Sequence, residues 1–182
     1  MRDTMRRQPA DLRALVADEG AVEAAAERLR GRRVVVVGTG TSWHAANHAL
    51  WFLRAAGVDA VAHQGMDAAL WPELFRGDDV VLLLSHRNFK RFTSEARDAL
   101  RERGIDVVVV AGVRSEGADI ETVVQETSAA FTASHLGALM RIAQIATVLG
   151  ADLGPLEAVP EAVEEVLDGP GPGVVAPAKL LE

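Results

Sequence analysis

The sequence predicts an α/β fold with a doubly wound, five-stranded parallel sheet that is flanked by helices on both faces. Two features lead to this prediction. Short runs of β-branched apolar residues alternate with longer stretches in which apolar residues recur at helical spacing. The chain has 182 residues, of which 49% are apolar, so it is long enough and apolar enough to form the core of one domain.

The individual elements follow from these runs in chain order. We expect strands at residues 33–37, 59–63, 80–85, 106–111 and, as a weaker pattern, 120–124. Helices are expected at residues 42–56, 67–75, 93–103 and 128–149. A glycine follows each of these helices closely, at positions 57, 77, 104 and 150, as is typical of helix C-termini.

Two further helical segments lie outside this alternation. Residues 8–30, inside an N-terminal helical segment that covers 1–30, predict a helix beside the sheet that packs against a neighbour. Residues 156–167 predict a last helix, and residues 168–182 are rich in proline and glycine, as in a linker or tail. The expected organisation is one domain over residues 1–167 and a tail over 168–182.

Composition and charge limit the classes of function. The formal net charge of −7 argues against a nucleic-acid partner, because phosphate backbones are bound mainly through clustered Lys and Arg. Without cysteine, the chain has no disulfide and no thiolate metal site. It has no signal-peptide pattern and no apolar run of the roughly 20 residues that span a membrane, so we expect a cytoplasmic protein without a membrane partner.

The stretch VVVVGTGTSWHA, residues 34–45, contains a glycine-rich turn between a strand and a helix. Such a turn directs the first backbone N–H groups of the helix, and the positive end of its dipole, to the carboxyl edge of the sheet, where they can bind an anion. Gly38 and Gly40 allow close approach, and the hydroxyls of Thr41 and Ser42 can donate to phosphate oxygens. The alternative is that these two hydroxyls only cap the helix.

Two well-known phosphate-binding motifs do not fit this turn. A Walker loop requires Gly-Lys-Ser/Thr, whereas residues 39–42 read TGTS. A dinucleotide fingerprint requires a small residue where Trp43 stands, and Asp59, the acid at the right spacing for a ribose, lies at the start of its strand and not at the end. We therefore expect no cofactor.

Three motifs resemble those of the sugar isomerase (SIS) domain family. GTSWHA at 40–45 is similar to the first loop of its double-domain members, Gly-Thr-Ser followed by an aromatic residue, His and Ala. RRQPADL at 6–12 resembles their N-terminal Glu-Gln-Pro-x-x-Leu segment, with Arg7 in place of the acid. ETSAAFT at 126–132 resembles the Glu-x-x-x-x-x-Thr stretch that opens a long helix. The resemblance covers roughly residues 1–167 and is to members such as the isomerase half of glucosamine-6-phosphate synthase.

The resemblance implies a flavodoxin-like three-layer sandwich that binds a sugar phosphate in hydroxyl-rich loops after the first and third strands. Gly40, Thr41 and Ser42 would form the first loop, and Thr132 of the third motif would join them. The chain carries one copy of a domain that these relatives carry twice. We therefore expect a homo-oligomer, a dimer or a tetramer, in which the N-terminal helix and the helix with Trp51 form contacts.

The second loop departs from the family pattern Ser-x-Ser-Gly-x-Thr. The sequence at 85–90 is SHRNFK, in which only Ser85 matches. Two hydroxyl donors and a glycine are lost, while Arg87, Asn88 and Lys90 stand in the same loop as candidate binding residues. Arginine pairs bidentately with phosphate, so cationic capture could replace the hydroxyls. The alternative is a solvated basic turn.

Glu126 is the candidate base for an aldose–ketose isomerisation or a deamination, which must move a proton beside a carbonyl. The alternative is a carboxylate at a helix entry that the dipole stabilises. His135, one turn into the long helix, and His86, in the second loop, are candidate acids. His44 and His48 are four residues apart but have no evident third ligand, so we expect no metal site.

Two classes of function stay open on these grounds. One is a sugar-phosphate or amino-sugar-phosphate isomerase or deaminase that uses the turn at residues 38–42. The other is a non-catalytic phosphosugar-sensing or assembly module, in which the altered second loop reflects lost chemistry.

Overall fold

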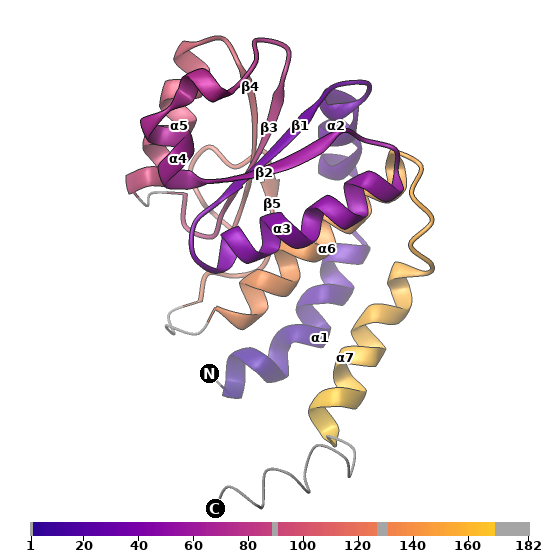
Figure 1. Cartoon of the computed structure of the whole chain (residues 1–182). Helices are drawn as coiled ribbons and strands as arrows, with labels where there is room; N and C mark the ends of the chain where they lie inside the picture. The colour runs from indigo at the N-terminus through magenta and orange to yellow at the C-terminus, as the bar shows by residue number, and fades with distance from the viewer. Residues whose placement is uncertain (1, 89–90, 127–130, 170–182) are drawn as a thin grey trace, which may run out of the picture.

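Five parallel strands form one sheet at the centre of the computed structural model, which describes residues 2–88, 91–126 and 131–169 (Figure 1). The strands are β1 (Val34–Gly38), β2 (Ala60–Gln64), β3 (Val80–Ser85), β4 (Asp106–Ala111) and β5 (Ile120–Glu121). Their order across the sheet is β2-β1-β3-β4-β5, and each pair is parallel. The predicted doubly wound α/β fold is confirmed. In this order the winding reverses between β1 and β3, where ligands of such folds bind.

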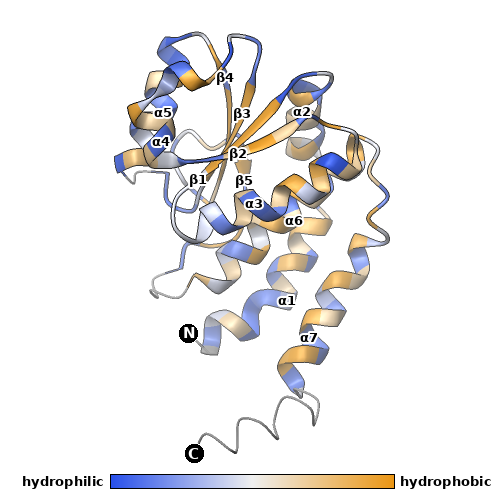
Figure 2. Ribbon diagram, viewed as in Figure 1, coloured by the Kyte–Doolittle hydropathy of each residue, from blue (hydrophilic) through white to orange (hydrophobic). Residues whose placement is uncertain are grey.

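Helices cover both faces of the sheet, as Figure 1 shows. On one face lie α2 (Gly20–Leu29), α3 (Thr41–Ala55) and α6 (Thr132–Val148), and on the other α4 (Gly65–Leu70), η1 (Pro72–Leu74) and α5 (Arg91–Glu102). Side chains of β1 alternate between the two cores, because successive residues of a strand point to opposite faces. All of β1 is buried, which explains its unbroken run of valines, and the inner strands of the sheet have mainly the hydrophobic colours in Figure 2.

The first helix, α1 (Arg2–Val16), packs against α6, and the last helix, α7 (Val159–Asp168), packs against α1, with η2 (Leu156–Ala158) preceding α7. The N-terminal helix therefore packs against helices of its own chain. Arg141 of α6, 2% exposed, fastens the end of α1: its guanidinium donates to the carbonyls of Leu15 (3.1 Å) and Asp18 (2.7 Å) and to the Asp18 carboxylate (2.6 Å).

Two predicted helices are interrupted in the structure. The prediction of a single helix over 8–30 is wrong, because α1 starts at Arg2 and a break after Val16 separates it from α2. At the break, the carbonyl of Leu15 accepts from the backbone N–H of Asp18 in a turn (3.2 Å), and the carbonyls of Leu15 and Asp18 both accept from Arg141. The helix expected over 67–75 divides into α4 and η1 because Pro72 has no N–H to continue α4.

The bounds of three other predicted segments differ from those that the structure describes. The last strand, expected over 120–124, is only Ile120–Glu121. The long helix begins at Thr132, and residues 128–130 of the expected range lie outside the described residues. Of the expected tail, only residues 168 and 169 are described. None of the helices in the described part of the chain is long and apolar enough to cross a membrane.

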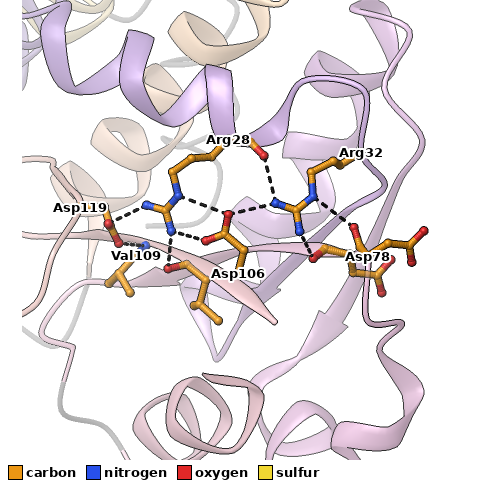
Figure 3. A network of polar contacts seen from close by, with 8 residues as sticks. Arg28, Arg32, Asp78, Asp106, Val109 and Asp119 are labelled. Atoms are coloured by element: carbon orange, nitrogen blue, oxygen red, sulfur yellow. Dashed lines mark hydrogen bonds and ion pairs between the residues drawn. The ribbon is translucent and has the colours of Figure 1, made fainter. Parts of the chain in front are cut away.

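A network of charges holds α2 to the amino edge of the sheet (Figure 3). Asp106, at the start of β4, accepts from Arg28 and from Arg32 (3.0 Å), and Arg28 also donates to Asp119 (2.7 Å). The hydrogen bond from Arg28 keeps the pKa of Asp106 below its usual value, against the opposing effect of burial. This cluster lies at the edge opposite the carboxyl ends of the strands, and its role is structural.

Candidate functional site

A pocket of about 520 Å³ lies at the carboxyl ends of β1, β3 and β4. The turn after β1, the loop after β3 and the first turns of α3, α5 and α6 line it. It therefore occupies the crevice where the strand order reverses, between β1 and β3. The start of α3 borders this cavity, as a ligand site at the glycine-rich turn requires.

The turn between β1 and α3 is shaped by two glycines. A Cβ on Gly38 would lie 2.4 Å from the carbonyl oxygen of Ser42, so only glycine lets the helix begin this close to the strand. Gly40 has φ of +60° and is the N-cap of α3, so neither Thr41 nor Ser42 occupies the capping position. The first bond of the helix runs from Trp43 N–H to the Gly40 carbonyl (2.9 Å). The N–H groups of Thr41 and Ser42 precede it, and both residues line the pocket.

The loop after β3 is held by its own side chains. The Ser85 hydroxyl accepts from the backbone N–H of Asn88 (3.1 Å), and the amide of Asn88 donates to the carbonyl of Glu116 (2.6 Å). Asn88 has φ of +49°, a conformation that asparagine adopts more readily than most residues. It shapes the turn and is not among the residues that line the pocket, whereas Ser85 is.

Two arginines line the pocket on this side. The Arg87 guanidinium donates to the backbone carbonyl of Glu126 (2.9 Å), a neutral partner. Arg91, at the start of α5, pairs with Glu95 one turn later (3.0 Å), and its side chain is 79% exposed. No Asp or Glu is among the described residues that line the pocket, so its side-chain charge is positive. Lys90, the other predicted cation, lies outside the described residues.

Glu126 is buried, 2% exposed, at the N-terminus of α6. Its carboxylate accepts from the backbone N–H groups of Thr132 (3.2 Å), Ala133 (3.3 Å) and Ser134 (2.8 Å). Burial would raise the pKa of Glu126, but the hydrogen bonds from Ser134, Ala133 and Thr132 outweigh it and hold the pKa below its usual value. This geometry favours the alternative of a helix-entry carboxylate, and Glu126 does not line the pocket.

His86 lines the pocket and is hydrogen-bonded to the backbone of Glu126. Its Nε2 accepts from the backbone N–H of Glu126 (2.7 Å), so this nitrogen carries no proton and the ring is neutral. Burial is the main cause of its lowered pKa, which the charge of Arg87 lowers further and that of Glu126 opposes. Because Nε2 is occupied, the structural role of His86 is to hold the segment that carries Glu126.

His135 lies between this pocket and a neighbouring groove that also borders Met5, Gln8 and Thr132. Burial lowers the pKa of His135, and a hydrogen bond to the backbone of Thr41 opposes this shift. Its ring is 5.9 Å from that of His48, edge to face. Because His135 lines the pocket and an imidazole can both accept and donate a proton, it is the described side chain there best suited to proton transfer.

The structure thus brings together most of the predicted site residues and separates the rest. Those that line the pocket are Gly40, Thr41, Ser42, Ser85, His86, Arg87 and His135. Thr132 borders only the neighbouring groove, and Asn88 and Glu126 lie behind the pocket wall. In residues 2–88, 91–126 and 131–169, no three His, Cys, Asp or Glu side chains are grouped so that they could hold a metal ion.

Several residues that line the pocket were not among the predicted site residues. Phe92 and Thr93 belong to it because α5 begins at Arg91, before the expected start of that helix, and Arg91 itself was expected only as part of the basic run over the carboxyl edge of the sheet. Ser134 and Phe131 join from the start of α6. The basic run at residues 86–91 was the one available signal for Arg91.

Comparison with known proteins gives one relative in sequence. Over 85 residues the chain is 32% identical to glutamine–fructose-6-phosphate aminotransferase (isomerizing) of Pyrobaculum aerophilum. This match takes in 47% of the chain but only 14% of the relative, so the chain corresponds to a small part of that protein. No family model matches the sequence.

Solved structures share the fold more completely. The NanR protein of Vibrio vulnificus, complexed with ManNAc-6P, superposes with a TM-score of 0.69 and 18% identity, over 91% of this chain and 66% of the other. The tagatose-6-phosphate ketose/aldose isomerase of Escherichia coli superposes with a TM-score of 0.68 and 14% identity, over 91% of this chain and 51% of the other. At these identities the likeness establishes the fold.

Proposed function

Because the chain has the fold of the sugar isomerase domains, we propose that it binds a sugar phosphate in the pocket at the carboxyl ends of β1 and β3. The observation that carries this proposal is the first turn of α3, where Thr41 and Ser42, whose N–H groups precede the first hydrogen bond within the helix, line the cavity. A helix N-terminus attracts a phosphate through its dipole and its unpaired N–H groups. The matches to proteins named for sugar phosphates support this choice of anion.

The catalytic part of the proposal is an aldose–ketose isomerisation or an amino-sugar-phosphate deamination. His135 is the group that would move the proton, because it lines the pocket and is near the start of α3 through its bond to the backbone of Thr41. Glu126 would act from behind the wall, by fixing the first turn of α6 on which His135 stands. A second candidate function is binding without turnover, which the lack of a described carboxylate in the pocket lining favours.

The proposal extends to a homo-oligomer, a dimer or tetramer, in the cytoplasm. Trp51 on α3 is 72% exposed, and an indole of this size is normally covered. α1 is covered by α6 and α7 of its own chain, so it is a weaker candidate for a contact than α3.

Thermal unfolding with matched ligands tests the binding function. Fructose 6-phosphate or glucosamine 6-phosphate at 100 times its Kd should add about 2.7 kcal/mol to the free energy of unfolding. Fructose and glucosamine at the same concentrations should add far less, because they lack the anion that α3 attracts. Equal shifts with phosphorylated and unphosphorylated sugars, or no shift with any of them, would refute the proposal.

The Glu126→Gln variant separates a catalytic base from a helix cap. We expect it to lower the free energy of unfolding by about 1 kcal/mol, as loss of a helix cap does, and to leave turnover within a few-fold of the wild type. The pKa of Glu126 is lowered in the folded state, so its stabilisation is present above the ordinary value of 4.5 and is lost as the pH falls below it. Urea unfolding should therefore show a larger difference in stability between the variant and the wild type at pH 7 than at pH 3.

Glu102→Gln is the matched control, because Glu102 is exposed at the end of α5. It should change neither stability nor turnover. A loss of turnover by a factor of roughly 100 or more in Glu126→Gln, with stability unchanged, would instead identify Glu126 as the base.

A further inference from the structure

The pocket carries more positive charge than one phosphate requires. Arg87 and Arg91 each contribute a full charge, and the N-termini of α3 and α5 contribute roughly half a charge each. No Asp or Glu is among the described lining residues, and the Glu126 carboxylate faces the N-terminus of α6. A phosphate monoester carries about −1.5 to −2. The positive charge of these groups exceeds it by about one unit, and Glu95, which pairs with Arg91 at the exposed rim, offsets part of that excess.

Arg87 is held away from the turn that contains Thr41 and Ser42. It follows β3, and its hydrogen-bond partner is the carbonyl of Glu126, in the segment after β5. The turn follows β1, which lies on the other side of β3 in the sheet. In the sheet β3 is next to β1, whereas β5 is three strands away from β1, and neighbouring strands are about 4.8 Å apart. A group bound on the Glu126 side of Arg87 would therefore lie at least one strand spacing from a phosphate at the turn.

Among the described residues, Arg87 has no charged partner. In the part of the chain that the structure describes it makes no ion pair, and its bond to the Glu126 carbonyl does not neutralise it. The guanidinium is half-buried, where an uncompensated charge is more costly than in water. An anion of the ligand would supply the missing charge, and a carboxylate matches the planar fork of an arginine.

We infer that the ligand is a sugar phosphate with a second anionic group, a carboxylate, at the end remote from the phosphate: the phosphate lies at the turn between β1 and α3, and the carboxylate at Arg87. This inference rests on the proposed function and narrows its substrate class to phosphorylated sugar acids. Arg87 is then the residue that selects them.

Isothermal titration with two open-chain ligands tests the inference. Glucitol 6-phosphate and 6-phosphogluconate differ only in that the second has a carboxylate in place of a terminal hydroxymethyl group. The acid should bind at least about 10-fold more tightly, as expected for a charge-assisted bidentate pair. Gluconate without phosphate should bind far more weakly than either.

The Arg87→Met variant assigns the preference to this side chain. It should remove the preference for 6-phosphogluconate. The affinity for glucitol 6-phosphate should stay within about threefold of the wild-type value, since that ligand has no carboxylate to pair with Arg87. Arg101→Met, which removes the same charge from the exposed far end of α5, should keep the preference. Thermal unfolding of both variants checks that they are folded.

Two results would overturn the inference while the proposed function stands. One is equal affinity of the wild type for the two phosphates. The other is an equal loss for both ligands in Arg87→Met, which would mean that Arg87 binds the same phosphate as α3. If none of the phosphorylated ligands binds the wild type, the proposed function fails and this inference fails with it.

Discussion

Ser42→Asp should abolish sugar-phosphate binding, with a loss of affinity of at least about 100-fold, as expected when a like charge meets a phosphate at short range. Ser42 is the second residue of α3 and lines the pocket. A carboxylate there would occupy the place of the phosphate and accept hydrogen bonds from the same backbone N–H groups. Because an acidic residue in the first turn favours a helix, the variant should be at least as stable as the wild type, by up to about 1 kcal/mol.

Ser42→Asn is the matched control, since asparagine has the size of aspartate without its charge. It should retain binding within about 10-fold, because the backbone N–H groups of α3 are unchanged. The contrast between these variants, measured by titration with fructose 6-phosphate, isolates the electrostatic contribution. Binding that survives Ser42→Asp would mean that the anion lies elsewhere, and the role assigned to α3 would be wrong.

Much of the fold could be predicted from the sequence because the pattern is local and strong. The valines of β1 are buried on both faces, and a fully buried parallel strand produces such an unbroken apolar run. The glycine-rich turn that follows it was predictable for a related reason, since Gly38 and Gly40 meet demands that only glycine satisfies. The part of the candidate site at the turn between β1 and α3 could therefore be predicted from the sequence.

What the sequence could not reveal depends on contacts between distant residues. The break between α1 and α2 is stabilised by Arg141, more than a hundred residues away, which donates to the carbonyls of Leu15 and Asp18. Likewise, an acidic residue before a long helix is compatible with a base or a cap, and only the three bonds from the start of α6 favour the cap for Glu126. Arg91 belongs to the pocket because of where α5 begins, which propensity does not specify closely.

Gly38→Ala should be the most destabilising single change at the site, lowering the free energy of unfolding by about 2 to 3 kcal/mol, at the upper end of the cost of overpacking. The added Cβ would lie 2.4 Å from the carbonyl oxygen and 2.5 Å from the carbonyl carbon of Ser42, and 2.8 Å from the nitrogen of Trp43. These are backbone atoms, so no side chain can rotate away. The first turn of α3 must move, and sugar-phosphate affinity should fall at least about 10-fold with it.

Gly77→Ala separates this steric effect from the general effect of replacing a glycine. Gly77 lies in the loop before β3 with nothing within 4 Å of an added Cβ, and its φ is not positive. An alanine there restricts mainly the unfolded chain, so stability should be unchanged or higher by up to about 1 kcal/mol. Urea unfolding of the two variants, with ligand titration of each, measures both effects. If Gly38→Ala behaved like Gly77→Ala, α3 would have room to start further from β1, and the close approach that we assign to phosphate binding would not be required.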